Sequence, residues 1–275
     1  MSVSSDWEPL EIIDDSDDEL NKNVVDQQKI ATLFIRKKKI LKSPQIALKQ
    51  YFYETPEIFE IGVDEAGRGP MFGRVYAAAV VLPKDTTSFD HSIPKDSKKF
   101  SSKQKIEEAY HYIKKNSLAW YVAYEDEKVI DQINILQATQ SAMHKAITEV
   151  KKQLLQKGLL IETNIKDNLF LLIDGNYFKP LTYVDKHTHK FETHKFQTIE
   201  GGDNKYTSIA AASILAKVDR DNYIDELCAQ YPDLSEKYGI DSNKGYGSKV
   251  HMEGIQKYGI TPWHRRSFGI CKNYA

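Results

Sequence analysis

Four acidic side chains follow or lie near apolar stretches, in positions from which they could do chemistry together. Asp64 and Glu65 end one apolar run, Asp174 closes another, and Asp221 lies in a helical segment rich in small residues. Carboxylate oxygens bind hard cations such as Mg²⁺ or Mn²⁺ in preference to zinc. Two such ions roughly 4 Å apart would stabilise the attacking and leaving oxygens of phosphodiester hydrolysis. The pattern predicts metal-dependent phosphoryl transfer.

Each acid also has a plain structural explanation. Asp64 and Asp174 would cap the turns that follow strands, where aspartate is common. Asp221 would form an ion pair with Lys217, because the i, i+4 spacing puts both on one helix face. Spacing along the chain does not show that the four carboxylates converge, so these alternatives stay open.

The acids need strands and helices to carry them. Three early strands, a long helix and then alternating elements predict an α/β domain with a mixed sheet. Ser101 followed by Gln104 resembles a capping box at the start of the first helix. The strands are predicted at residues 59–64, 75–82, 118–124, 169–174 and 195–199, and the helices at 101–115, 133–157, 206–217, 219–230 and in the last forty residues.

Composition excludes several classes of protein. The chain has 275 residues, of which 41% are hydrophobic, so a core of ordinary size can be buried. The longest uninterrupted apolar run, residues 75–82, is too short to cross a bilayer, and the first residues lack the pattern of a secretory signal. Two cysteines, Cys228 and Cys271, provide neither a disulfide framework nor a zinc cluster. We therefore expect a soluble intracellular protein that does not associate with a membrane.

The net charge of −1 hides a strong asymmetry. Residues 1–26 carry nine acids and a single lysine, whereas residues 27–50 carry seven basic residues and no acid. Blocks of like charge keep a segment solvated and oppose folding. We expect residues 1–55 to form a largely disordered N-terminal tail, first acidic and then basic, before a catalytic domain at 56–275.

The motifs resemble, in their order, those of ribonuclease HII, a type 2 ribonuclease H. The resemblance implies a ribonuclease H-like mixed β-sheet flanked by helices, with a helical C-terminal part. Residue 64 begins the run Asp-Glu-Ala-Gly-Arg-Gly-Pro, which differs from the variant typical of ribonuclease HIII. The segments that carry the resemblance are residues 61–70 with 75–80, 96–99, 133–139 with 142–143, 173–176, 202–203, 208–221, 244–247, His251 and 262–268.

The resemblance implies an endoribonuclease that acts on RNA–DNA hybrids and on ribonucleotides embedded in duplex DNA. Cleavage on the 5′ side of the ribonucleotide would leave 3′-hydroxyl and 5′-phosphate ends through two-metal-ion catalysis. Asp219 is a rival for one metal-binding place, although the family's Arg-Asp pair matches Arg220 and Asp221. The implied catalytic and metal-binding residues, with two Mg²⁺ or Mn²⁺ ions, are Asp64, Glu65, Asp174 and Asp221.

The resemblance also implies how the substrate is held. The family's glycine-arginine-glycine motif contacts the 2′-hydroxyl, the group that separates RNA from DNA. Tyr246 matches the tyrosine that stacks on the next sugar; its alternative is a packed core tyrosine. Lys217 would lie near the substrate backbone or in the ion pair named above, and Lys98 would contact phosphate or be a plain solvated lysine. The implied substrate-binding residues are Gly67, Arg68, Gly69, Ser97, Lys98, Lys217 and Tyr246.

Two departures from the family pattern stand out. Arg74 replaces a second proline, and we expect an arginine there to be tolerated close to a nucleic acid. The stretch between Asp174 and residue 201 is longer than usual and holds His187, His189 and His194. We expect these histidines at exposed hairpin positions and not as ligands.

Residues 45–52 resemble the sliding-clamp-binding motif of replication proteins. A one-turn helix would place an aliphatic and two aromatic side chains on one face for a hydrophobic groove. The alternative is that these side chains fold back onto the catalytic domain. The motif residues are Gln45, Leu48, Tyr51 and Phe52.

Residues 10–19, an aliphatic run followed by acids, resemble a SUMO-interacting motif that would add to a sheet edge. With the clamp motif, this would suit a nuclear or replication compartment as well as a cytoplasmic one. We expect a monomer. The other function considered is a catalytically weak adapter that binds nucleic acid or a clamp on a ribonuclease H fold; the full carboxylate set argues against it.

Overall fold

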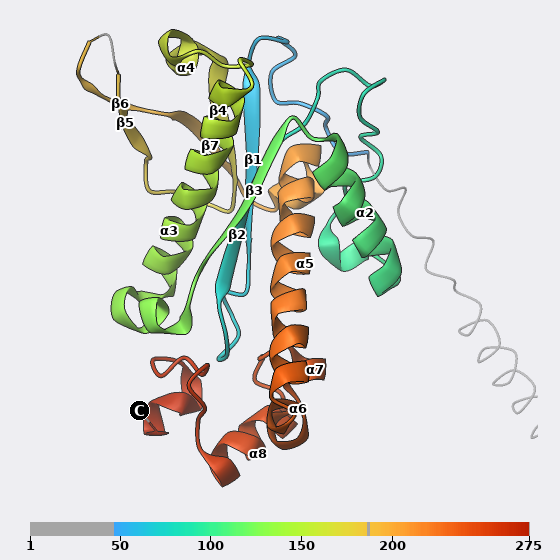
Figure 1. Ribbon diagram of the computed structural model, residues 1–275, viewed down its shortest axis with the longest axis vertical. Coiled ribbons are helices and arrows are strands. Elements are labelled where there is room, and N and C mark those ends of the chain that lie inside the picture. Colours follow the sequence, from blue (N-terminus) through green and yellow to red (C-terminus); the bar gives the residue numbers. More distant parts are fainter. Residues whose placement is uncertain (1–46, 186–187, 275) are drawn as a thin grey trace, which may run out of the picture. The chain divides into compact units, whose positions relative to one another are not determined.

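Five strands form the central sheet of the protein, whose computed structural model describes residues 47–185 and 188–274 (Figure 1). In the order β3-β2-β1-β4-β7, the first three strands pair antiparallel, and β1, β4 and β7 run parallel. The predicted mixed sheet is therefore confirmed, with every predicted strand within two residues of its observed bounds. The strands are β1 (Phe59–Ala66), β2 (Val75–Val81), β3 (Ala119–Glu125), β4 (Leu169–Asp174) and β7 (Lys195–Ile199).

Helices cover both faces of this sheet (Figure 1). One face packs against α3 (Glu127–Gln156) through a buried cluster that includes Val63 and Met143. The other packs against α5 (Thr207–Gln230) and α2 (Lys103–Asn116). Successive side chains of β2 point to opposite faces of the sheet, so Ala77 and Ala79 belong to the first cluster and Ala78 to the second. Their small side chains let the helices come close to the sheet.

Gly62 in β1 is the point of closest approach between the sheet and α5. A Cβ atom built there would lie 2.3 Å from the backbone carbonyl carbon of Ser208, far inside any real contact. Glycine is therefore required at this position for α5 to lie directly on β1. This packing fixes the helix that carries Asp221 against the strand that carries Asp64.

The long helix α3 contains a break that explains why its first turns were not predicted. Asn134 has φ 67° and ψ 162°, and its Oδ1 accepts a hydrogen bond of 3.1 Å from the amide of Gln137. The side chain thus caps the second part of the helix. The sequence prediction, residues 133–157, begins at this internal cap and omits the first turns from Glu127.

Two other helix predictions were wrong in detail. The predicted helices at 206–217 and 219–230 are one continuous helix, α5, in which Val218 is helical and buried. The capping box predicted at Ser101 is absent: Ser102 is the N-cap of α2 and accepts from the amide of Lys105 at 3.3 Å. Gln104 instead donates to Glu108 at 2.9 Å.

The remaining elements complete the predicted helical C-terminal part and include a hairpin in the stretch where the histidines were expected at hairpin positions. No helix in the described part of the chain is long and apolar enough to span a membrane. The hairpin consists of β5 (Thr182–Val184) and β6 (Phe191–Thr193); the other elements are α4 (Ile165–Asn168), α6 (Asp233–Tyr238), α7 (Ile240–Asn243), α8 (Lys249–Tyr258) and 3₁₀ turns at Ser97–Lys99, Glu162–Asn164, Gly202–Asn204 and Gly269–Tyr274.

Candidate active site

The four predicted carboxylates line one cleft of about 530 Å³. Asp64 and Glu65 lie towards the end of β1, and Asp174 ends β4, its parallel neighbour. Because Val63 pairs with Ile173, the carboxyl ends of these two strands bring Asp64 and Asp174 to the same edge of the sheet. Asp221 reaches the cleft from α5, which packs against β1. The convergence that the sequence left open is present.

Burial and mutual repulsion dominate the electrostatics of these acids. Asp64 is 5% exposed, and its pKa is raised well above the usual range, first by burial and then by the charges of Glu65 and Asp174. Burial also raises the pKa of Glu65, against the opposing effect of Arg68, and the pKa of Asp174. Ionised carboxylates whose charges repel one another in this way are stabilised by a cation between them.

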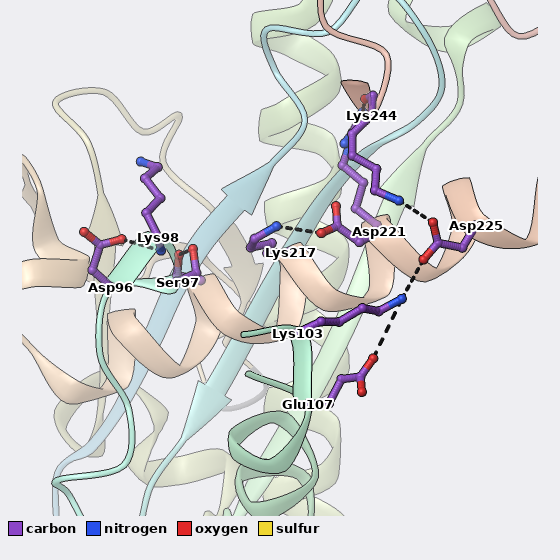
Figure 2. Close-up of polar contacts among 11 residues, drawn as sticks. Asp96, Ser97, Lys98, Lys103, Glu107, Lys217, Asp221, Asp225 and Lys244 are labelled. Atoms are coloured by element: carbon purple, nitrogen blue, oxygen red, sulfur yellow. Dashed lines mark hydrogen bonds and ion pairs between the residues drawn. The ribbon is translucent and has the colours of Figure 1, made fainter. Parts of the chain in front are cut away.

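The donor chemistry fits a divalent cation, but Asp221 is turned to another partner. Lys217 Nζ lies 2.6 Å from Asp221 Oδ2, the ion pair considered as an alternative (Figure 2). Within residues 47–185 and 188–274, no three histidine, cysteine or acidic side chains form a ready-made cation cage. Asp219, the rival, accepts a 2.5 Å hydrogen bond from Tyr110 and does not line the cleft.

The glycine-arginine-glycine turn borders the carboxylates. Gly67 has φ 92°, and a Cβ atom there would lie 2.3 Å from the Nε atom of Arg220. Gly69 faces the ring of Tyr246, whose Cε1 would be 3.3 Å from an added Cβ. The Arg68 guanidinium contacts Glu65 at 3.1 Å. Gly67 is needed here for its positive φ and for the close approach of Arg220, whereas Gly69 leaves room beside the Tyr246 ring.

Tyr246 is not a core tyrosine. Its side chain is 53% exposed and lines the cleft, so the packed alternative is wrong. Two of the contacts that hold its loop come from side chains: Asn243 Oδ1 accepts from the amide of Gly245 at 2.8 Å, and Arg220 donates to the carbonyl of Lys244 at 2.8 Å. The ring is thus presented to the cleft by a fixed backbone.

The loop before α2 supplies the other predicted substrate contacts. Ser97 is buried, and its Oγ lies 3.3 Å from Oγ of Ser213 on α5. Asp96 caps this turn by accepting from the amide of Lys98 at 2.9 Å, and the Lys98 side chain extends outward (Figure 2). Both residues line the same cleft as the carboxylates.

Arg265 was quoted within a motif but given no role by sequence reasoning. Its side chain is 0% exposed, and burial lowers the pKa of its guanidinium to about 9. The only signal for Arg265 in the sequence was its place in the motif at residues 262–268. Its guanidinium donates to five carbonyl oxygens of the glycine-rich loop. The acceptors are Gly67 (2.6 Å), Pro70 (2.7 Å), Gly73 (2.8 Å), Arg68 (3.1 Å) and Arg74 (3.1 Å).

Asp203 is a second residue that sequence reasoning missed. It is 9% exposed and lines the cleft as a fifth acid, and its charge contributes to the raised pKa of Asp174. Asn204 donates to Asp203 at 3.0 Å and to Asp96 at 3.2 Å. Asn204 therefore ties this acid to the loop that carries Ser97. The only signal for Asp203 in the sequence was the motif Gly202-Asp203.

The unusual residues have different outcomes. The Arg74 guanidinium lies between the rings of Tyr124 and Tyr223, 4.0 and 4.2 Å from their centroids, and its tolerance close to a nucleic acid stays a prediction. His194 is 3% exposed and stacks on Tyr183 at 4.4 Å, although an exposed position was expected. His189 is exposed as predicted, and His187 lies outside the described residues.

The described part of the clamp motif packs on the domain. The Tyr51 hydroxyl donates to the carbonyl of Lys84 at 2.7 Å, and the Phe52 ring stacks on Phe170 at 5.3 Å. Backbone hydrogen bonds join Lys49 to the start of α5 and hold the segment in place, and Leu48 is half-buried. This is the alternative arrangement named above. Gln45 and residues 10–19 lie outside the part of the chain that the structure describes.

A larger hollow, of about 980 Å³, lies between β3 and α3, away from the four carboxylates. Its acids are paired or used as caps: Glu125 with Lys145 at 2.7 Å, and Asp126 with the amide of Val129. Size therefore does not identify the reactive site here. The smaller cleft is the better candidate, because it gathers mutually perturbed carboxylates.

Known proteins resemble this chain in sequence and in fold. The family model described as Ribonuclease HII matches residues 61–271. A ribonuclease HII of Parabacteroides distasonis is 42% identical over 219 residues, which cover 80% of this chain and 94% of that protein. Two solved structures share the fold. The PCNA:RNase HII complex of Archaeoglobus fulgidus has 22% identity and a TM-score of 0.55, and the match covers 77% of this chain and 96% of that one. Bst-RNase HIII in complex with Mn²⁺ has 16% identity and a TM-score of 0.57, and the match covers 79% of this chain and 69% of that one.

Proposed function

The chain belongs to the ribonuclease HII family and is a ribonuclease H, and we propose that it cuts on the 5′ side of a ribonucleotide. The substrates are ribonucleotides embedded in duplex DNA and the RNA strand of RNA–DNA hybrids, and the products carry 3′-hydroxyl and 5′-phosphate ends. The main support for this proposal is that Gly69 and Tyr246 meet in the cleft that the four carboxylates line. A group that contacts a 2′-hydroxyl and one that stacks on the next sugar must both lie beside the reacting phosphate.

Each element of the cleft has a distinct task in this proposal. The backbone of residues 67–69 approaches the ribose closely, since glycine leaves room for it. The exposed Tyr246 ring packs against the following sugar and disfavours a 2′-hydroxyl there. Ser97 and Lys98 contact the phosphate backbone from the other border of the cleft. Selectivity for the RNA-to-DNA step then comes from Gly69 and Tyr246 together.

The carboxylates Asp64, Glu65, Asp174 and Asp221 would hold two divalent cations, Mg²⁺ or Mn²⁺. When bound, such ions lower the pKa of water and stabilise the departing 3′-oxygen. The raised pKa of Asp64 supports this assignment, because its ionised form needs nearby positive charge. Asp221 has to exchange Lys217 for the cation, which frees that ammonium for the substrate backbone. The relative solved with Mn²⁺ is a ribonuclease HIII and adds support for this class of ion.

The direct test uses a labelled DNA duplex with one ribonucleotide beside an RNA–DNA hybrid, each with Mg²⁺, Mn²⁺ or EDTA. A metal-dependent cut just 5′ of the single ribonucleotide is expected. Cutting of the hybrid alone would restrict the proposal to hybrid processing. No cutting of either substrate would favour the adapter, which the complete carboxylate set otherwise opposes.

Binding of a sliding clamp through residues 45–52 stays a prediction. The Archaeoglobus fulgidus relative was solved in complex with PCNA, which supports it. Tyr51 and Phe52 would have to leave Lys84 and Phe170 to enter a clamp groove. Size-exclusion chromatography with the clamp should show a complex that the variant Tyr51→Ala/Phe52→Ala does not form. SUMO binding through residues 10–19 likewise stays a prediction, to be tested by titration of that peptide.

A further inference from the structure

Two lysines from distant segments share a single carboxylate on α5. Lys103 Nζ lies 2.8 Å from Asp225 Oδ2, and Lys244 Nζ is bonded to Oδ1 of the same group (Figure 2). Lys103 is the first residue of α2, and Lys244 precedes Gly245 and Tyr246. We call Lys103 and Lys244 the rim lysines. Glu107 also reaches Lys103, but only at 3.9 Å.

The rim lysines stand beside the cleft in line with the carboxylates. Asp225 is four residues after Asp221 on α5, which corresponds to a rise of about 6 Å. Lys244 lines the cleft together with Asp221. One strand of a duplex advances about 3.4 Å per nucleotide. On a duplex whose axis ran along α5, a phosphate about two nucleotides from one at Asp221 would therefore lie beside Asp225.

Stability alone gives little reason for this arrangement. The Lys103 side chain is 64% exposed, and ion pairs that are this exposed contribute little to stability. Lys244 has φ 51°, a left-handed conformation that is unfavourable for lysine. Arg220 and Asp225 nevertheless hold its carbonyl and its ammonium. Such strain is found at binding and catalytic sites, where a fixed geometry is useful.

We propose that the rim lysines contact a backbone phosphate of the substrate strand and that Asp225 is the positioning residue that holds them. The ligand is a phosphodiester of nucleic acid. The proposal rests on the proposed function, because it places the strand along α5 from Asp221. Two ammonium groups fixed on the single carboxylate of Asp225 leave one positive charge, which Glu107 partly offsets from 3.9 Å, and they lose little further side-chain freedom when the phosphate arrives.

The experiment measures binding of the duplex with one ribonucleotide by fluorescence anisotropy, in EDTA and over a range of KCl concentrations. The slope of log affinity against log salt counts the phosphates that are neutralised. Lys103→Gln and Lys244→Gln should each make this slope shallower, by about 0.9 for each phosphate that the variant no longer neutralises. Lys105→Gln is the matched control, because Lys105 is exposed in the same first turn of α2 and does not contact Asp225; it should keep the wild-type slope.

Asp225→Asn tests the positioning role. In that background Lys103→Gln should change the slope less than in the wild type, because the lysine is no longer held. A full effect in both backgrounds would remove Asp225 from the proposal. Melting temperatures near the wild-type value would show that each variant is folded.

Wild-type slopes in both lysine variants would overturn the rim site, and cleavage of the duplex by the wild type would still leave the proposed function standing. Conversely, shallower slopes without any cleavage would leave the phosphate contact in place while the proposed reaction failed. The two failures are therefore distinguishable.

Discussion

The Nη2 atom of Arg265 donates to the carbonyl of Gly67 at 2.6 Å, although the two residues are 198 positions apart in the chain. Gly67 begins the turn that we assign to the 2′-hydroxyl, and Arg265 comes from the C-terminal part. The C-terminal segment therefore sets the shape of a loop that belongs to the first strand connection. Selectivity for ribose would depend on both ends of the domain.

Replacing Arg265 by lysine should impair both folding stability and cleavage. A lysine ammonium cannot reach five carbonyls, and each buried acceptor left unpaired costs about 1–3 kcal/mol. We expect the free energy of unfolding to fall by at least about 3 kcal/mol, with a loss of preference for the single-ribonucleotide duplex over all-DNA competitor. Urea denaturation and cleavage competition measure the two effects.

Arg266→Lys is the control for that change, since Arg266 is exposed and its backbone amide, not its side chain, bonds Asp131. It should resemble the wild type in both measurements. An Arg265→Lys variant with unchanged stability and preference would show that the loop keeps its shape without the guanidinium.

Asp64→Asn should abolish turnover while leaving substrate binding largely intact. The amide has nearly the same size but lacks the charge that a divalent cation needs, so we expect a loss of at least about 10²–10³-fold in kcat. Single-turnover cleavage in Mg²⁺ gives the rate, and anisotropy in EDTA gives the affinity. Near wild-type cutting by the Asn variant would mean that the site has been placed wrongly.

The strand that carries Asp64 could be predicted from the sequence because it is short, apolar and ends at Gly67-Arg68-Gly69. Convergence with Asp174 could not, since it depends on β1 and β4 being parallel neighbours, a pairing between residues more than 100 positions apart. The same limit applies to Arg265, whose role exists only once a distant loop closes around it. The local sequence pattern predicts the strands and helices, but the site depends on contacts between segments that are far apart in the chain.

The errors have local causes too. His194 was expected at an exposed hairpin position, but it directly follows β6 and its ring is buried against Tyr183. Asn134 caps a second helical segment inside α3, so the apolar periodicity begins there and not at Glu127. The sequence of Tyr51 and Phe52 is compatible with a binding motif and with packing on the domain. The contacts with Lys84 and Phe170 show the packed arrangement, and clamp binding stays a prediction.

Gly62→Ala should destabilise the protein strongly. The new methyl group would overlap the backbone of Ser208, and neither the strand nor α5 can move without disturbing the rest of the layer. Overpacking of this kind costs about 1–3 kcal/mol and occasionally more. The midpoint of urea denaturation should therefore fall. Gly247→Ala is the control, because an added Cβ there meets Met71 at an ordinary 3.4 Å; equal midpoints for the two variants would contradict the close approach of β1 and α5.

A chain of neutral histidines should make stability fall in acid. The amide of Thr261 can only donate, so His264 Nδ1 accepts (2.9 Å) and the proton of that ring is on Nε2. That proton is donated to His251 Nε2 at 3.0 Å, and His251 Nδ1–H then donates to the carbonyl of Tyr246 at 2.9 Å. Burial, and then His251, lower the pKa of His264 to about 3. The loop that presents Tyr246 thus depends on an uncharged pair.

The unfolded chain binds a proton at this histidine near its ordinary pKa of about 6.5, whereas the folded chain does so only near pH 3. Between these values the unfolded state holds more protons, so stability decreases as the pH falls, by up to about 1.4 kcal/mol per pH unit for one such group. His264→Gln should remove that share of the slope between about pH 6 and pH 4, as measured by urea denaturation at each pH. His111→Gln, on the exposed face of α2, should keep the wild-type slope. An unchanged slope in His264→Gln would mean that the buried pair accepts a proton without loss of the fold.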